Sequence, residues 1–141
     1  MKRLALAGLC ALLFAGHAMA QTTCSNATLT GTYAGISTSG TLAGLLGATA
    51  IPIYIEAQVK SNGTGTATAN INYTTVGGAV SSGTTESVTF TINSDCSLTG
   101  SAVIAGIPAT LVGHINPSGD TAYVVSQTVG IGLNGVLHKV D

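Results

Sequence analysis

The sequence predicts an all-β protein, an antiparallel up-and-down barrel of about eight strands, with a β-sandwich as the alternative. Three observations lead to this prediction. Gly, Thr, Val and Ile are abundant, and helix-forming patterns are almost absent. Apolar and polar residues alternate with a period of two, which is the pattern of half-buried strands. Short turn sequences separate the alternating segments, so consecutive strands are expected to pair.

The clearest strand covers residues 51–60. Its odd positions are all apolar, whereas its even positions are Pro, Tyr, Glu, Gln and Lys. Successive side chains of a strand point to opposite faces, so the odd positions are expected to face the core. Pro52 cannot donate a ladder hydrogen bond and is expected at the start of the strand or on an edge. The dipeptide Asn62-Gly63 then predicts a hairpin turn.

Other segments repeat this alternation. Val88, Phe90 and Ile92 share one face of the strand that precedes the turn Asn93-Ser94-Asp95. Pro117 and the glycine two residues later predict a second tight turn. The inward faces of the last two strands are ambiguous. The predicted strands are 30–38, 51–60, 64–73, 86–92, 97–104, 107–115, 121–127 and 131–140.

Two segments are expected to be loops. Residues 40–50 are apolar, but their glycines and threonines argue against anything longer than one helical turn. Residues 74–84 are rich in Gly and Ser, which predicts a long connection.

The first twenty residues are expected to form a cleaved signal peptide, and residues 21–141 a single β-barrel domain. Lys2 and Arg3 precede an apolar run over residues 4–15, and Ala18-Met19-Ala20 resembles a cleavage site. The apolar run is too short to cross a membrane and no longer one follows, so no integral membrane span is expected. The chain is therefore predicted to be exported to the periplasm or the extracellular medium.

Export leads to an oxidising compartment, where two cysteines in a small domain usually pair. Cys24 and Cys96 are the cysteines that remain after the signal peptide is removed. A disulfide between them is the expectation, and two free buried thiols are the alternative.

The charge pattern restricts the partners. Beyond residue 20, Lys60 and Lys139 stand against five carboxylates, which leaves a net charge of −3. Without a basic patch, nucleic acid is not expected to bind. An outer-membrane barrel would need aromatic girdles, whereas this part of the chain has four tyrosines and one phenylalanine.

Two short motifs resemble a known group of proteins. The segment Cys24–Tyr33 contains a cysteine followed by Leu-x-Gly-x-Tyr, and Asn93–Ser97 reads Asn-x-Asp-Cys-Ser. Together with the Gly-rich hairpin at Asn62–Thr66, these pieces are similar in kind and order to those of small exported bacterial β-barrel proteins. The resemblance implies a disulfide-tied barrel and no particular chemistry.

Catalytic and metal-binding candidates are weak. His114, Ser118 and Asp120 are close in sequence, but a triad needs converging geometry and an oxyanion hole. His114, His138 and Asp120 would have to meet at one point to bind a metal. Glu56 and Glu86 could pair as carboxylates if their strands adjoin, but both are expected on the outer face. We therefore expect no catalytic residue, no metal site and no cofactor.

Two functions remain under consideration. Many residues predicted to face inward are Gly, Ala or Val, so an eight-stranded barrel could keep a narrow apolar space. This favours a non-enzymatic module that binds a small apolar ligand. The alternative is a structural, fimbrial-like subunit that assembles on a surface by strand addition.

Overall fold

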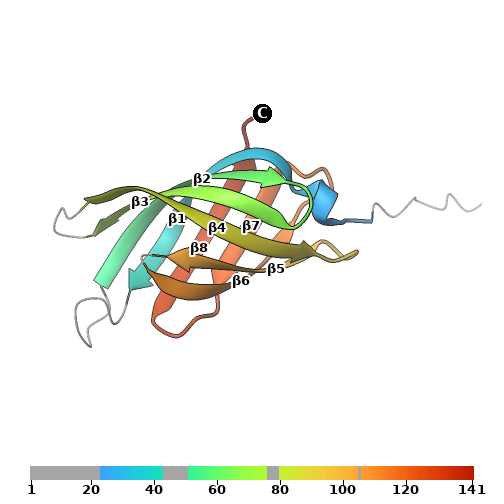
Figure 1. Cartoon of the computed structure of the whole chain (residues 1–141). Coiled ribbons are helices and arrows are strands. Elements are labelled where there is room, and N and C mark those ends of the chain that lie inside the picture. Colours follow the sequence, from blue (N-terminus) through green and yellow to red (C-terminus); the bar gives the residue numbers. More distant parts are fainter. Residues whose placement is uncertain (1–22, 43–50, 76–79, 105) are drawn as a thin grey trace, which may run out of the picture.

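The computed structural model describes residues 23–42, 51–75, 80–104 and 106–141. Within these ranges, a short 3₁₀ helix precedes eight strands that pair in sequence order, and the last strand pairs with the first (Figure 1). The sheet is therefore a closed antiparallel barrel, and the sandwich alternative is wrong. The elements are η1 (Asn26–Thr28), β1 (Thr30–Leu42), β2 (Ile51–Asn62), β3 (Thr66–Thr75), β4 (Val80–Ile92), β5 (Ser97–Ile104), β6 (Ile107–Ile115), β7 (Thr121–Ser126) and β8 (Ile131–Lys139).

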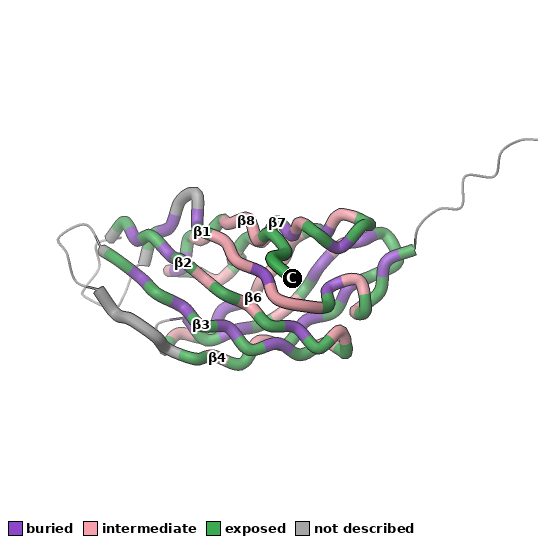
Figure 2. The backbone as a smooth tube through the Cα atoms, turned by 90° about the horizontal axis from the view of Figure 1, so that it is seen from above, coloured by how far each residue is buried: buried purple, intermediate pink, exposed green. Residues whose placement is uncertain are grey.

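Burial alternates along the strands as the sequence predicts (Figure 2). In β2, Ile53 and Ile55 are buried while Tyr54 and Glu56 are exposed. The same alternation continues through β3, β4 and β5, so the apolar face of each strand lines the interior of the barrel. Pro52 is the second residue of β2, in agreement with its missing donor.

The predicted loop at residues 74–84 is largely wrong, and the predicted loop at residues 40–50 is wrong over residues 40–42. β1 continues to Leu42, four residues beyond its predicted end, because it pairs with β2 on one side and with β8 on the other. β3 reaches Thr75 and β4 begins at Val80, so the Gly- and Ser-rich stretch is mostly strand. Cross-strand pairing therefore outweighs local propensity at both places. The remainders of these loops, 43–50 and 76–79, lie outside the described residues, as does the predicted signal peptide.

The ambiguous last strands obtain their inward faces from register. Ala122 of β7 lies opposite the buried Ile115 of β6, and Ile131 of β8 lies opposite Leu42 of β1. Ala122 and Ile131 are buried, whereas Tyr123 is exposed.

The strands of the barrel differ in length. β1 and β4 have 13 residues each, whereas β5 has 8 and β7 has 6. The pairing of β4 with β5 ends at Thr89 opposite Ser101, so the part of β4 between Val80 and Val88 has no partner in β5.

Candidate functional site

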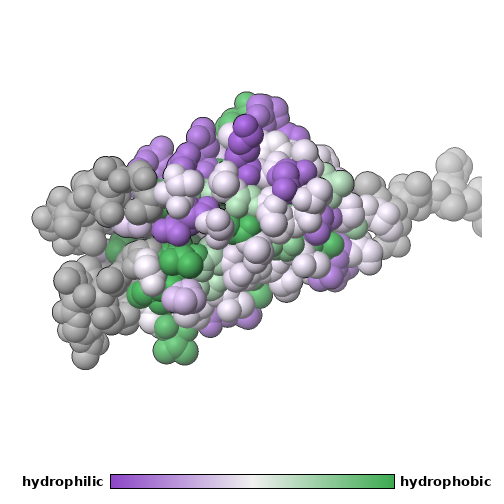
Figure 3. Space-filling view, in the orientation of Figure 1, coloured by the Kyte–Doolittle hydropathy of each residue, from purple (hydrophilic) through white to green (hydrophobic). Residues whose placement is uncertain are grey.

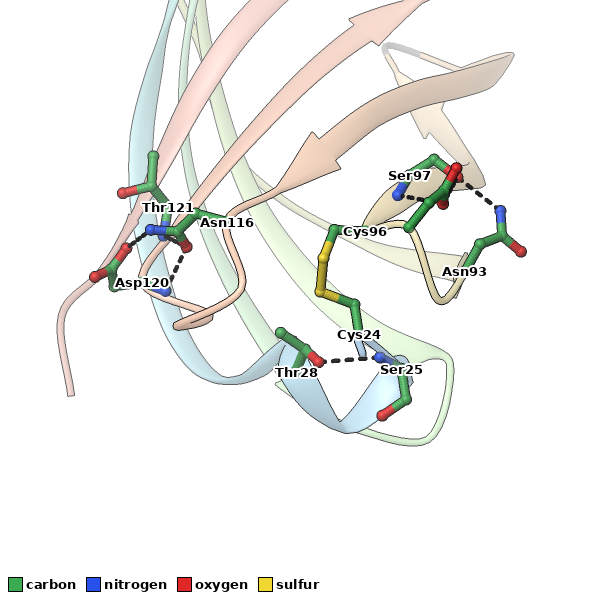
Figure 4. The surroundings of a disulfide bond; sticks show 10 residues. Cys24, Ser25, Thr28, Asn93, Cys96, Ser97, Asn116, Asp120 and Thr121 are labelled. Atoms are coloured by element: carbon green, nitrogen blue, oxygen red, sulfur yellow. Dashed lines mark hydrogen bonds between the residues drawn. A yellow bond between two sulfur atoms is a disulfide. The ribbon is translucent and has the colours of Figure 1, made fainter. Parts of the chain in front are cut away.

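One end of the barrel is closed by the N-terminal segment and the predicted disulfide. Cys24 and Cys96 are bonded, with their Cα atoms 5.0 Å apart (Figure 4). The Cys24 N–H donates to the carbonyl of Ser94 at 3.3 Å, and the Ile115 N–H donates to the carbonyl of Cys96 at 3.0 Å. Asn26 of η1 accepts a 2.7 Å hydrogen bond from the Ile92 N–H. The segment before β1 is thereby held across the ends of β4, β5 and β6.

Buried side chains complete this closure. Leu29 and Phe90 are almost wholly buried, and Tyr33 is 0% exposed. The Tyr33 hydroxyl donates to the Gly119 carbonyl at 2.6 Å, which ties β1 to the turn before β7. Burial, with a smaller effect from Asp120 and then Asp141, raises the pKa of Tyr33 above its usual value.

The interior of the barrel contains a cavity of about 120 Å³. It is lined from both halves of the core, with Leu29 and Phe90 near the disulfide end and Ile71 and Ile104 in the other half. Among the described lining residues, Ser37 is the one with a polar side chain. The cavity is therefore an apolar space inside the barrel.

The cavity results from small side chains. An eight-stranded barrel is just wide enough for its interior to be filled by side chains. Here residues 21–141 contain no Trp and one Phe, so little bulk is available. Seven lining residues are glycine or alanine: Gly35, Ala57, Ala67, Ala69, Gly100, Ala102 and Gly135.

Ser37 is already engaged by the backbone. Its Oγ accepts a 2.8 Å hydrogen bond from the Ile55 N–H. Ser37 lies within the irregularity of the β1–β2 pairing and at the start of the irregularity of the β1–β8 pairing. The hydroxyl of Ser37 thus satisfies a backbone N–H where the strand pairing is irregular. It is not free for a ligand, and the cavity wall stays apolar in character.

Glu86 is the residue at which the sequence-based expectation fails most clearly. It was expected on the outer face, but it lies directly opposite the buried Ala69 of β3. Along β4, Thr85 and Ser87 are exposed while Glu86 and Val88 are half-buried, so Glu86 shares the inward face with Val88. Glu56 does lie on the outer face, as expected, where it is exposed on β2 opposite Asn72 and does not pair with Glu86.

The candidate triad does not assemble. His114 is exposed on the outer face of β6. Asp120 instead accepts a hydrogen bond from the Asn116 side chain and donates its N–H to the Asn116 amide oxygen within the same turn (Figure 4). Hydrogen bonding, first from Asn116 and then from Ser118, lowers the pKa of Asp120. Among the described residues, no hydrogen bond joins His114 to Ser118 or Asp120.

The candidate metal site does not assemble either. The Nδ1 of His138 lies 3.3 Å from the Thr121 hydroxyl. The described residues contain no group of three His, Cys, Asp or Glu side chains that could hold a metal ion.

No family model, curated protein or solved structure matches this chain. The resemblance to small exported barrels therefore stays a prediction. None of the helices in the described ranges has the length and apolar character to cross a membrane.

Proposed function

We propose that this chain is an exported, non-enzymatic binding module that holds a small apolar ligand inside its barrel. The observation that carries the proposal is the apolar cavity of about 120 Å³. An apolar cavity of comparable size, engineered in another protein and lined by similar side chains, stays dry and binds benzene or xenon. The lining of Ile, Leu, Phe and Ala suits the same class of ligand.

The size of the cavity limits the ligand. Pockets for drug-sized molecules usually measure roughly 300–1,000 Å³. A space of about 120 Å³ matches a single ring or a short alkyl segment instead. The proposed ligand is therefore small, or inserts a small apolar portion.

Three further features support the other parts of the proposal. The Lys2-Arg3 start and the Ala18-Met19-Ala20 site favour export, and the disulfide suits an oxidising compartment. The candidate catalytic groups are exposed or bonded within turns, which favours a binding role over catalysis. The outward face of the strands is mostly Thr, Asn, Gln and Ser, which favours contact with water over contact with nucleic acid or lipid.

The ligand proposal is tested by titrating isotope-labelled protein with toluene and with 1-hexanol while recording NMR spectra. Saturable shifts are expected at residues that line the cavity. Ala102→Leu should fill the space and weaken binding at least tenfold, whereas Thr99→Leu, which adds a similar side chain on the exposed face of β5, should not. An absence of saturable shifts, or equal affinity in both variants, would contradict the proposal.

A second candidate function, self-assembly, is favoured by one observation. Phe90 donates its N–H to Gly65 on the β3 side, so Ser87, three residues earlier, directs its N–H to the opposite side, where β5 no longer pairs. A free strand edge of this kind can pair with β4 of a second copy. The candidate is weaker because Glu86 places a charge on this stretch, and inward-pointing charges commonly protect free edges.

Light scattering at millimolar protein concentration tests this alternative. Assembly through the edge predicts a concentration-dependent dimer or larger species that Ser87→Pro abolishes, since proline removes the N–H that faces away from β3. A monomer at all concentrations would exclude it.

A further inference from the structure

Glu86 lies beside the cavity without lining it. Val88, two residues along the same face of β4, and Ala69, directly opposite on β3, both line the cavity. Residues in directly opposed positions have Cβ atoms only about 4.5–5.5 Å apart. The Glu86 side chain therefore projects from the inward face at the rim of the apolar space.

This carboxylate is half-buried. Among the described residues, no hydrogen bond or ion pair to the Glu86 side chain is present. A partly buried charge loses hydration, and that loss is normally offset by a hydrogen-bonded or oppositely charged group. The described part of the chain does not supply such a group to Glu86.

The position of Glu86 also leaves room for a partner from outside the chain. Glu86 belongs to the part of β4 that precedes Thr89, and this part does not pair with β5. The neighbouring outward positions, Thr85 and Ser87, are exposed and would carry a charge without loss of hydration. Placement of the carboxylate on the inward face thus brings a negative charge next to an apolar cavity.

We propose that the ligand of this barrel is a small cationic amphiphile, a primary amine with a short alkyl or aryl tail. The tail occupies the apolar cavity, and the ammonium group donates hydrogen bonds to the Glu86 carboxylate at its rim. This inference rests on the proposed ligand-binding function of the cavity and adds the charge of the ligand to it. No covalent step is involved.

The experiment compares n-hexylammonium, 1-hexanol and n-hexanoate, which share a tail and differ in head group, by calorimetric titration at pH 7. Hexylammonium should bind at least about tenfold more tightly than hexanoate, since the ammonium donates charge-assisted hydrogen bonds to the Glu86 carboxylate whereas the carboxylate of hexanoate is repelled by it. Glu86→Gln should remove this preference and leave hexanol binding unchanged. Glu56→Gln is the matched control, because it makes the same charge change at an exposed position of β2.

The outcomes separate this inference from the function on which it rests. Hexanol binding without a preference for hexylammonium, or the same loss in Glu86→Gln and Glu56→Gln, would overturn the inference and leave the apolar site intact. Failure of all three compounds to bind would overturn both. Self-association of Glu86→Gln with unchanged ligand preference would overturn the inference by assigning Glu86 to edge protection.

A second readout needs no variant. Hexylammonium should shift the side-chain carboxyl ¹³C resonance of Glu86 in the wild-type protein, and hexanol should not. The shift should saturate at the same concentration as the calorimetric signal. A Glu86 resonance that does not respond to hexylammonium would contradict the inference even if Glu86→Gln failed to fold.

Discussion

At the scale of single residues, Cys96 combines two constraints. Its φ of 67° lies in the left-handed region, where a side chain costs about 1–2 kcal/mol relative to glycine. Its sulfur is bonded to Cys24, 72 residues earlier in the sequence. A cross-link over that separation restricts the unfolded chain and contributes about 4 kcal/mol in the loop-entropy model. The disulfide therefore outweighs the conformational cost of a cysteine at a position that suits glycine.

This balance predicts an order of stability among variants. Cys96→Ser should lower the free energy of unfolding by about 4 kcal/mol. Cys96→Gly loses the same bond but relieves the backbone, so it should be more stable than Cys96→Ser by about 1 kcal/mol. Urea denaturation measures both. Cys24→Ser is the control, since it removes the bond without changing residue 96, and a glycine variant less stable than the serine variant would contradict the argument.

Tyr33 predicts a stability change at high pH. Its hydroxyl is buried and donates to Gly119, and its pKa is raised, mainly by burial. The folded state thus favours the neutral phenol more than the unfolded chain does. This contribution is fully present below the ordinary pKa of 10.0 and is lost as pH rises through the raised folded value.

Tyr33→Phe should lower the free energy of unfolding by about 1–2 kcal/mol at pH 7, because the Gly119 carbonyl loses its donor. Above pH 10 the difference between variant and wild type should shrink. Denaturation midpoints at pH 7 and at high pH test this, with Tyr54→Phe as a control at an exposed tyrosine. A difference that is constant with pH would show that Tyr33 does not titrate as described.

At the scale of elements, close approach between strands depends on glycine at particular positions. A Cβ added to Gly113 of β6 would collide with the Tyr123 carbonyl of β7. A Cβ added to Gly35 of β1 would collide with the Val136 carbonyl of β8. Both glycines therefore lie where the curved wall brings neighbouring backbones together.

Gly113→Ala should lower the free energy of unfolding by about 1–3 kcal/mol, because β6 and β7 must move apart. Gly135→Ala is a suitable control on β8, since its added Cβ would stand 3.3 Å from the nearest atom, the Ile36 carbonyl oxygen. Thermal unfolding of both variants provides the comparison. Equal stability of the two would mean that the close approach at Gly113 does not constrain the barrel.

At the scale of the whole molecule, the barrel keeps an internal space at some loss of stability. Figure 3 shows residues of polar or intermediate hydropathy over most of one face, and hydrophobic residues mainly toward the end away from the disulfide. The interior holds the apolar cavity, which lacks the packing contacts that larger side chains would supply. The proposed ligand-binding function would require this space to stay unfilled.

Ala102→Leu should therefore raise the free energy of unfolding by about 0.5–2 kcal/mol while it weakens ligand binding. Ala102 is 6% exposed and lines the cavity, so the added carbons replace empty space. Chemical denaturation in the absence of ligand measures the gain. A loss of stability would indicate that the space around Ala102 cannot accept the larger side chain.

Much of the fold could be predicted because short-range rules govern it. The alternation around Ile53 and Ile55 identified β2 and its inward face, and two cysteines in a domain expected to be exported predicted their bond. The strand at residues 80–85 was missed because its Ser- and Gly-rich sequence resembles a loop, and only pairing with β3 makes it a strand. Glu86 was placed on the wrong face because a charged side chain is usually exposed. Its position two residues before Val88 in the alternation already indicates the inward face.

The sequence alone determined the all-β class, the alternation of most strands and the cysteine pairing, because these depend on local pattern and composition. The tertiary structure alone decided that the sheet closes, since closure requires β1 to pair with β8 across nearly the whole chain. It also decided that small side chains from β1, β2, β3, β5 and β8 meet around one cavity, with Glu86 at its rim. The physical reason is that cavity volume and the pairing of distant strands depend on where side chains converge in space.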